Sequence, residues 1–151
     1  MIEHLNSLLP TLIAFDIKLV LEIHGEYSTG AILNHVVELI DTPFVKINYD
    51  TANVIFYGGK NPEKDMDSCI QNIAYMHLKD KNGGSKEWDF PALGKGYINF
   101  PAIIKKLDQA GNQCPFSVEI EFTKDGPKDL DEINQAVKES YDYLVTMGYK
   151  I

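Results

Sequence analysis

The sequence predicts an α/β fold with four parallel strands, and two patterns support that prediction. Short apolar runs typical of buried strands alternate with segments whose apolar residues recur every three or four positions, as on one face of a helix. Gly, Pro and Asn residues separate many of these segments. Strands that alternate with helices form parallel sheets with right-handed crossovers. The expected order of elements is therefore α-β-α-β-α-β-α-β-α.

The first half of the chain contains two of the expected strands. Residues 2–13 carry apolar side chains at three- and four-residue spacing and predict an amphipathic helix. The run 19–21 predicts a short strand, and a second amphipathic segment, 31–40, predicts the next helix. Pro43 cannot continue that helix, so the apolar run 44–49 is the second strand.

The middle of the chain contains the third strand between two loops. Residues 51–62 are rich in Gly and Asn and predict a loop, and residues 63–72 predict a short helix. The run 73–78 predicts the third strand. Residues 80–98 contain four glycines and predict a long loop.

The last part of the chain predicts a helix, a strand and a final helix. Residues 100–110 predict a helix that Gly111 ends. The run 116–122 predicts the fourth strand. Asp129 is the expected cap of the last helix, with Glu132 three residues further on.

Composition and charge narrow the classes of function. The 151 residues are 44% hydrophobic and suit one domain, residues 1–151, with an apolar core. The net charge of -8 repels nucleic-acid phosphates and anionic membranes, and no apolar run approaches the ~20 residues that span a bilayer. No signal peptide is evident, and the two cysteines do not form a CxxC pair. We expect a cytoplasmic protein with free thiols that binds neither nucleic acid nor membrane.

Ionisable residues follow or interrupt all four predicted strands. Glu22 and Asp50 come directly after apolar runs, His77 follows the apolar residues 73–76 of the third strand, and Glu119 and Glu121 lie within the fourth. A carboxylate there costs several kcal/mol unless it is paired or metal-bound. Each residue alone also fits a helix cap or a surface ion pair. Because parallel strands end on one face of the sheet, however, the sequence predicts that these groups meet there.

Two or three carboxylates and one imidazole suit a divalent cation. Mn²⁺, Mg²⁺, Co²⁺ and Zn²⁺ all accept such ligands. Carboxylates brought close together repel one another, and a cation offsets that repulsion. A bound ion can also polarise a carbonyl and a hydroxyl of a substrate. The pattern therefore predicts a site for one divalent metal ion.

Five short motifs then occur in order along the chain. They are LEIH at 21–24, INYDTAN at 47–53, HLKD at 77–80, LGKGYINF at 93–100 and SVEIE at 117–121. In this series the chain resembles the xylose isomerase-like TIM barrel family of sugar phosphate isomerases and epimerases. That family also includes inosose dehydratase-like and 3-dehydroshikimate dehydratase-like enzymes. The motifs are not specific for a substrate.

The resemblance implies a metal held by Glu22, Asp50, His77 and Glu119. It also implies that Glu22 and Glu119 act as catalytic acid/base groups, which move a proton at a carbon next to a carbonyl through an enediolate. Glu119 is preferred to Glu121 because it is the first glutamate of the VEIE-type motif. Period-two alternation puts both glutamates on the same side of the strand, so Glu121 stays an alternative.

Four further residues are candidates for contact with a small sugar or polyol substrate. His24 lies two residues after Glu22 but also fits a cap of the following turn. Asn53 fits either substrate contact or stabilisation of its loop. Lys79 fits a substrate oxygen or a solvated position, and Trp88 fits a pocket wall or core packing.

Three functions remain open at this stage. The first is a metal-dependent sugar isomerase or epimerase. The second is a lyase, namely an inosose- or dehydroshikimate-type dehydratase with the same metal set. The third is a non-catalytic remnant, a truncated barrel that binds metal without turnover.

The number of strands sets a further expectation. The family barrel has eight βα units in ~250 residues, whereas this chain resembles only its C-terminal half, strands five to eight. The first and last strands would then be bare edges, which favour pairing. We expect a half barrel that is completed in a homodimer, with an excised fragment as the alternative.

Overall fold

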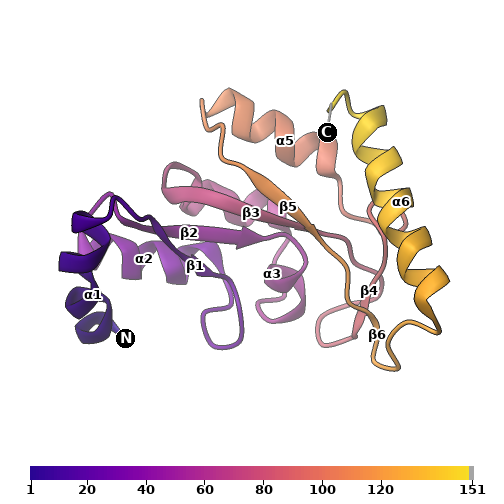
Figure 1. Ribbon diagram of the computed structural model, residues 1–151, viewed down its shortest axis with the longest axis horizontal. Helices are drawn as coiled ribbons and strands as arrows, with labels where there is room; N and C mark the ends of the chain where they lie inside the picture. The colour runs from indigo at the N-terminus through magenta and orange to yellow at the C-terminus, as the bar shows by residue number, and fades with distance from the viewer. Residues whose placement is uncertain (150–151) are drawn as a thin grey trace.

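The computed structural model describes residues 1–149, and a parallel four-stranded sheet lies at its centre (Figure 1). The strand order is β1-β2-β3-β5, and each neighbouring pair is parallel. This confirms the predicted α/β fold with four parallel strands. The strands are β1 (Leu19–Glu22), β2 (Val45–Asp50), β3 (Ile73–Lys79) and β5 (Phe116–Glu119).

Four longer helices connect or flank these strands. They are α1 (Ile2–Ala14), α2 (Gly30–Ile40), α5 (Phe100–Gln109) and α6 (Leu130–Thr146). Three of them, α2, α5 and α6, have polar N-cap residues, namely Thr29, Asn99 and Asp129. Their side chains accept hydrogen bonds from the backbone N–H groups of residues 32, 102 and 132, respectively. Such caps satisfy N–H groups that have no partner within the helix.

The core lies between the central strands and the helices. Ile47 and Tyr49 of β2 and Met76 and Leu78 of β3 are fully buried, and Ile103 of α5 is buried with them. Each large apolar side chain that leaves water contributes about 1.5–3 kcal/mol to stability. The core therefore fixes the central strands and, with them, the residues at their ends.

Two predicted segments differ in detail from the structure. The expected loop 51–62 contains a helical turn, α3 (Asn53–Phe56). The Asp50 carboxylate starts it by accepting hydrogen bonds from the N–H groups of residues 52 and 53. The expected helix 63–72 is instead α4 (Pro62–Asp65) and two 3₁₀ turns, which the non-helical backbone of Cys69 separates.

The fourth strand is shorter than predicted. Its partner β3 ends at Lys79, which is paired with Glu119, so the parallel ladder stops there. Phe122 then adopts a positive φ of 60°, and β6 (Phe122–Thr123) pairs antiparallel with β4 (Asp89–Phe90) inside the long loop. Glu121 therefore lies beyond the parallel sheet.

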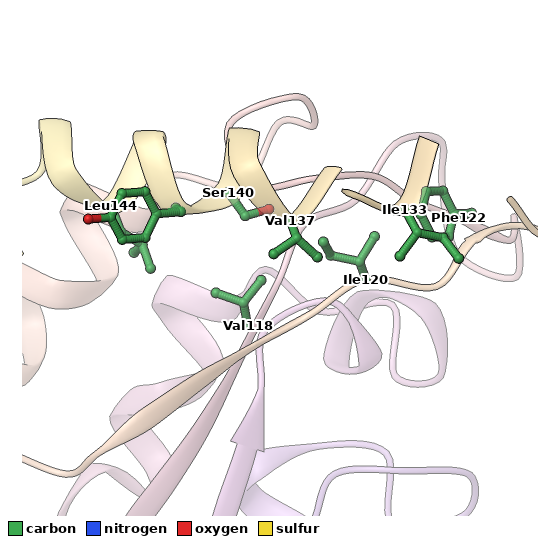
Figure 2. Close-up of a pocket in the computed structure, with 8 residues that line it drawn as sticks. Val118, Ile120, Phe122, Ile133, Val137, Ser140 and Leu144 are labelled. Atoms are coloured by element: carbon green, nitrogen blue, oxygen red, sulfur yellow. The ribbon is translucent and has the colours of Figure 1, made fainter. Parts of the chain in front are cut away.

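An apolar groove runs between α6 on one side and β5 with the segment that follows it on the other. Figure 2 shows the side chains of this segment facing those of the helix. The groove has a volume of about 360 Å³. Its lining includes Val118, Ile120, Phe122, Ile133, Val137 and Leu144. It lies beside the edge of β5, which pairs with no further strand within residues 1–149.

Among the described residues, no helix combines the length and apolar character that crossing a membrane requires. Both cysteines, Cys69 and Cys114, are free thiols.

A single buried carboxylate organises the long loop after β3. Asp80 is fully buried and accepts hydrogen bonds from the backbone N–H groups of Lys81, Gly94, Gly96 and Ile98. The distances lie between 2.8 and 3.2 Å. The carboxylate therefore holds the LGKG motif against the end of β3.

We expect Asp80→Ala to lower the free energy of unfolding by about 3 kcal/mol, because four backbone donors lose a charged acceptor. Asp80→Asn keeps one acceptor oxygen and is expected to lose roughly half as much. Urea unfolding followed by circular dichroism measures both values. Equal stability of the alanine variant and wild type would contradict this role.

Candidate metal centre

The strand ends bring four potential metal ligands to one place. Glu22, Asp50 and Glu119 are the last residues of β1, β2 and β5, and His77 lies on β3 next to Asp50 in register. Each offers one ligand atom, and these atoms all lie within 4.8 Å of one another. The expected ligands from four strands thus form one cluster.

The imidazole of His77 lies at the centre of the cluster. Its Nδ1 lies 2.6 Å from Glu119 Oε2, 3.1 Å from Glu22 Oε1 and 3.8 Å from Asp50 Oδ2. Hydrogen bonds to Glu119 and Glu22 raise the pKa of His77 to about 10, although burial opposes that shift. The hydrogen bond from His77 holds the pKa of Glu119 down at about 2. A proton on Nδ1 therefore offsets the negative charge of the carboxylates around it.

Asp50 is the most deeply buried of the four. Its Oδ1 accepts hydrogen bonds from Ala52 N at 2.9 Å and Asn53 N at 2.7 Å. Its Oδ2 is buried and has no hydrogen-bond partner within the described chain. Burial raises the pKa of Asp50 to about 7, and the positive charge of Lys79 opposes that shift.

These observations fit a divalent cation. An ionised carboxylate oxygen that is buried without a partner costs several kcal/mol, and coordination would satisfy it. Three carboxylates and one imidazole nitrogen suit Mn²⁺, Mg²⁺, Co²⁺ or Zn²⁺. Glu22, Asp50, His77 and Glu119 would hold the ion.

Two of the expected substrate-binding residues are buried beside the candidate ligands instead of facing solvent. The Lys79 ammonium is buried, 2.9 Å from Glu119 Oε1 and 2.5 Å from Glu121 Oε2. Burial lowers the pKa of Lys79, but the nearby carboxylates outweigh that effect and raise it. The Asn53 amide accepts a hydrogen bond from Lys79 and donates one to the backbone oxygen of Ile23. Both residues therefore help to hold candidate metal ligands in place: Lys79 pairs with Glu119, and Asn53 donates a hydrogen bond to Glu22.

The other two expected residues lie outside the cluster. His24 is exposed, and its Nε2 lies 3.0 Å from the hydroxyl of Tyr57. Trp88 is half-buried and packs edge-on against Phe56 and Phe90, with ring centroids 5.5 and 5.3 Å apart. Trp88 thus belongs to an aromatic cluster, which agrees with the core-packing interpretation.

Sequence reasoning missed two residues near the site. Asn48 lies 3.1 Å from His77 Nε2, and Tyr57 contacts His24. Glu121, the alternative ligand, pairs with Lys79. A signal existed for Asn48, because a polar residue within a buried strand, two positions before Asp50, shares its side of the strand. Nothing in the sequence pattern marked Tyr57.

A model of a known protein family matches most of the chain. The family model described as "Xylose isomerase-like TIM barrel" matches residues 1–146. The chain belongs to the xylose isomerase-like TIM barrel family. Its four parallel strands therefore correspond to part of a TIM barrel. Among curated proteins, none matches the chain at a significant level.

Solved structures of this family share the fold at low sequence identity. The chain is similar to the IolI protein with a zinc atom, with a TM-score of 0.78 and 19% identity over 96% of this chain and 54% of that one. D-psicose 3-epimerase with D-tagatose, from Clostridium cellulolyticum H10, gives a TM-score of 0.76 and 14% identity over 94% and 53%. The probable 3-DHS dehydratase AsbF from Bacillus anthracis gives 0.65 and 16% over 91% and 54%. The chain spans about half the length of these proteins.

Protonation of the site sets the pH dependence of metal binding. A cation must displace the proton from His77 Nδ1 and, below about pH 7, a proton from Asp50. Raising the pH removes these competitors, so the affinity for Zn²⁺ is expected to increase about tenfold per pH unit between roughly pH 7 and 9. Competition with a chromophoric chelator measures this slope. An affinity that is constant or falls over this range would contradict the assignment.

Proposed function

We propose that this chain binds one divalent metal ion and moves a proton next to the carbonyl of a sugar or sugar-like polyol, as an isomerase or epimerase does. The observation that carries the proposal is the convergence of Glu22, Asp50, His77 and Glu119 at the carboxyl ends of the parallel strands. In barrels of this class the active site lies at that end. The IolI structure with zinc and the epimerase structure with D-tagatose share this fold and support the proposal.

The two glutamates suit proton transfer because of where they lie. Glu22 ends β1 and Glu119 ends β5, the two outer strands of the sheet. A substrate between them would have a carboxylate on each side. One carboxylate would take a proton from the carbon next to the carbonyl, and the other would return a proton to the enediolate. Return to the opposite face inverts that carbon, and return to the neighbouring carbon moves the carbonyl.

The supporting residues keep these carboxylates in place. Lys79 pairs with Glu119, and this ion pair together with the His77 hydrogen bond keeps Glu119 ionised, which is the form that a base requires. The Glu22 side chain is 35% exposed, so a substrate can reach it. When bound, a divalent ion would polarise the substrate carbonyl and make the adjacent proton easier to remove.

Proton exchange in D₂O tests this function. We expect the Mn²⁺- or Co²⁺-loaded protein to introduce deuterium next to the carbonyl of at least one ketose, measured by NMR. Glu119→Gln is expected to slow this exchange by about 10²–10⁴-fold, since the amide cannot accept the proton. Glu26→Gln changes an exposed glutamate just after β1 and serves as the matched control. A metal-loaded protein that exchanges no proton in any sugar would favour the non-catalytic remnant.

A second candidate function is the loss of water from an inosose- or dehydroshikimate-type substrate. The structural likeness to the probable 3-DHS dehydratase favours it. The same base could remove the proton. The hydroxyl group on the next carbon would then take up a proton and leave as water, whereas in the isomerase reaction a proton returns to carbon. A dehydrated product in place of an isomer distinguishes the two reactions.

We also propose that a second copy of this chain completes the barrel. Within residues 1–149, β1 pairs only with β2 and β5 only with β3, so each has one free edge. A two-fold axis along the barrel would put β5 of one copy beside β1 of the other. Both seams would then be parallel, like the strand pairs within one copy, and the eight strands would close without an edge.

Apolar residues flank both free edges and support this arrangement. Of the twelve large hydrophobic residues that are exposed in the described chain, eight lie at these two ends. Leu8, Ile13, Phe15 and Ile17 belong to α1 or the turn after it, and Leu130, Val137, Tyr141 and Val145 belong to α6. Eight such side chains, each about half exposed, carry on the order of 700 Å², close to the about 800 Å² per partner of a stable interface.

The mass in solution tests this dimer. We expect light scattering to give twice the 17.0 kDa of one chain. Val137→Glu puts a charge into the groove between α6 and β5 and is expected to give monomers, because burying it would cost several kcal/mol. Leu39→Glu changes a residue of similar exposure on α2 and should leave the dimer intact. A monomeric wild type would contradict the proposal.

A further inference from the structure

Asn48 is a buried amide in contact with His77 of the candidate metal centre. It lies on β2 two residues before Asp50 and is 5% exposed. Its Nδ2 lies 3.1 Å from His77 Nε2. Its Oδ1 is buried without a hydrogen-bond partner in residues 1–149. The remaining buried side-chain atom without a partner there is Asp50 Oδ2, so both such atoms belong to this site.

The chemistry of the imidazole ring decides which amide atom Nε2 needs. Nδ1 faces the three carboxylates and is the nitrogen placed to bind a cation. A neutral imidazole that binds metal through Nδ1 carries its hydrogen on Nε2. The protonated ring also carries a hydrogen there. In both states Nε2 is a donor, and it requires an acceptor opposite it.

The amide of Asn48 can supply that acceptor by a half-turn about its last side-chain bond. The turn exchanges Oδ1 and Nδ2, which are of nearly the same size and occupy nearly the same positions. Oδ1 would then accept the hydrogen bond from Nε2–H at about the present 3.1 Å separation. With Nδ2 facing Nε2 instead, two donors would meet in the metal-bound state. A buried donor pair of this kind is unfavourable, because neither hydrogen has an acceptor.

We propose that Asn48 is a positioning residue that fixes the hydrogen of His77 on Nε2 and so selects Nδ1 as the metal ligand. This inference rests on the metal site of the proposed function and adds a residue to it. Partners of this kind on the second ring nitrogen typically change metal affinity by 10–100-fold. The edge-on contact of His77 with Tyr75, at a centroid distance of 6.0 Å, holds the ring plane but offers no acceptor to Nε2.

Paired variants separate the acceptor from the shape of the side chain. Asn48→Leu keeps the branched shape of the side chain but offers no acceptor, and we expect its affinity for Zn²⁺ to fall 10–100-fold. Asn48→Asp keeps an acceptor and loses the donor, and we expect it to bind Zn²⁺ at least as tightly as wild type. If the donor Nδ2 mattered instead, the aspartate variant would lose affinity as the leucine variant does.

The ring itself provides a readout that an added charge cannot mimic. In the protein with ¹⁵N-labelled histidine and bound ¹¹³Cd²⁺, we expect cadmium coupling at Nδ1 of His77 and a proton on Nε2 in wild type and in Asn48→Asp. In Asn48→Leu we expect weaker binding and loss of this single pattern. His77→Ala identifies the resonances among the four histidines.

The outcomes distinguish this inference from the proposed function. A wild type that binds no Zn²⁺ or Cd²⁺ would overturn the metal site and, with it, this role of Asn48. A wild type that binds, with equal affinity and the same ring pattern in Asn48→Leu, would overturn the role of Asn48 alone. Urea unfolding of the metal-free variants shows whether a loss of binding comes from a loss of folding.

Discussion

Three carboxylates surround one imidazole, and their negative charge must be offset. The rest of this structure depends on that constraint. Parallel strands end on the same face of a sheet, so the residues at their ends must share one small volume. Here that volume holds Glu22, Asp50 and Glu119 around Nδ1 of His77. Such a cluster persists only with a proton or a cation at its centre. The raised pKa of His77 and the unpartnered oxygen of Asp50 are two consequences of the same crowding.

Polar residues in contact with the ligands fix how the ligands are oriented. Asn53, Lys79 and Asn48 contact Glu22, Glu119 and His77 in turn. Such contacts fix which atom each ligand presents, and they tie the ligands to a rigid core. Lys79 also pairs with Glu121, which gives this second glutamate a structural partner outside the ligand cluster. The difference between Glu119 and Glu121 follows from the end of the parallel ladder at Lys79, which leaves Glu121 beyond the sheet.

The second physical constraint on this molecule is that its open sheet leaves strand edges unpaired. A barrel has no edges, whereas β1 and β5 each expose one within the described chain. The apolar faces of α1 and α6 flank those edges, and the groove of Figure 2 lies where α6 extends past β5. Completion by a second copy would cover these surfaces and place two ligand sets in one barrel.

The sequence by itself determined the order of the four parallel strands and the main helices, and the residues at the strand ends, but not the two-stranded sheet of β4 and β6. These follow from local periodicity and from the cost of placing ionisable groups in buried strands, both of which can be read along the chain. The helical turn at Asn53 begins at the nearby Asp50 carboxylate, which the loop pattern of the sequence did not reveal. The end of the fourth strand at Glu119 was decided by its partner β3, far away in sequence. For the same reason, only the tertiary structure placed Lys79 and Asn53 in contact with the ligands. It also placed Trp88 in an aromatic cluster and Asn48 against His77. Contacts between strands depend on register and burial, which no single stretch of sequence contains.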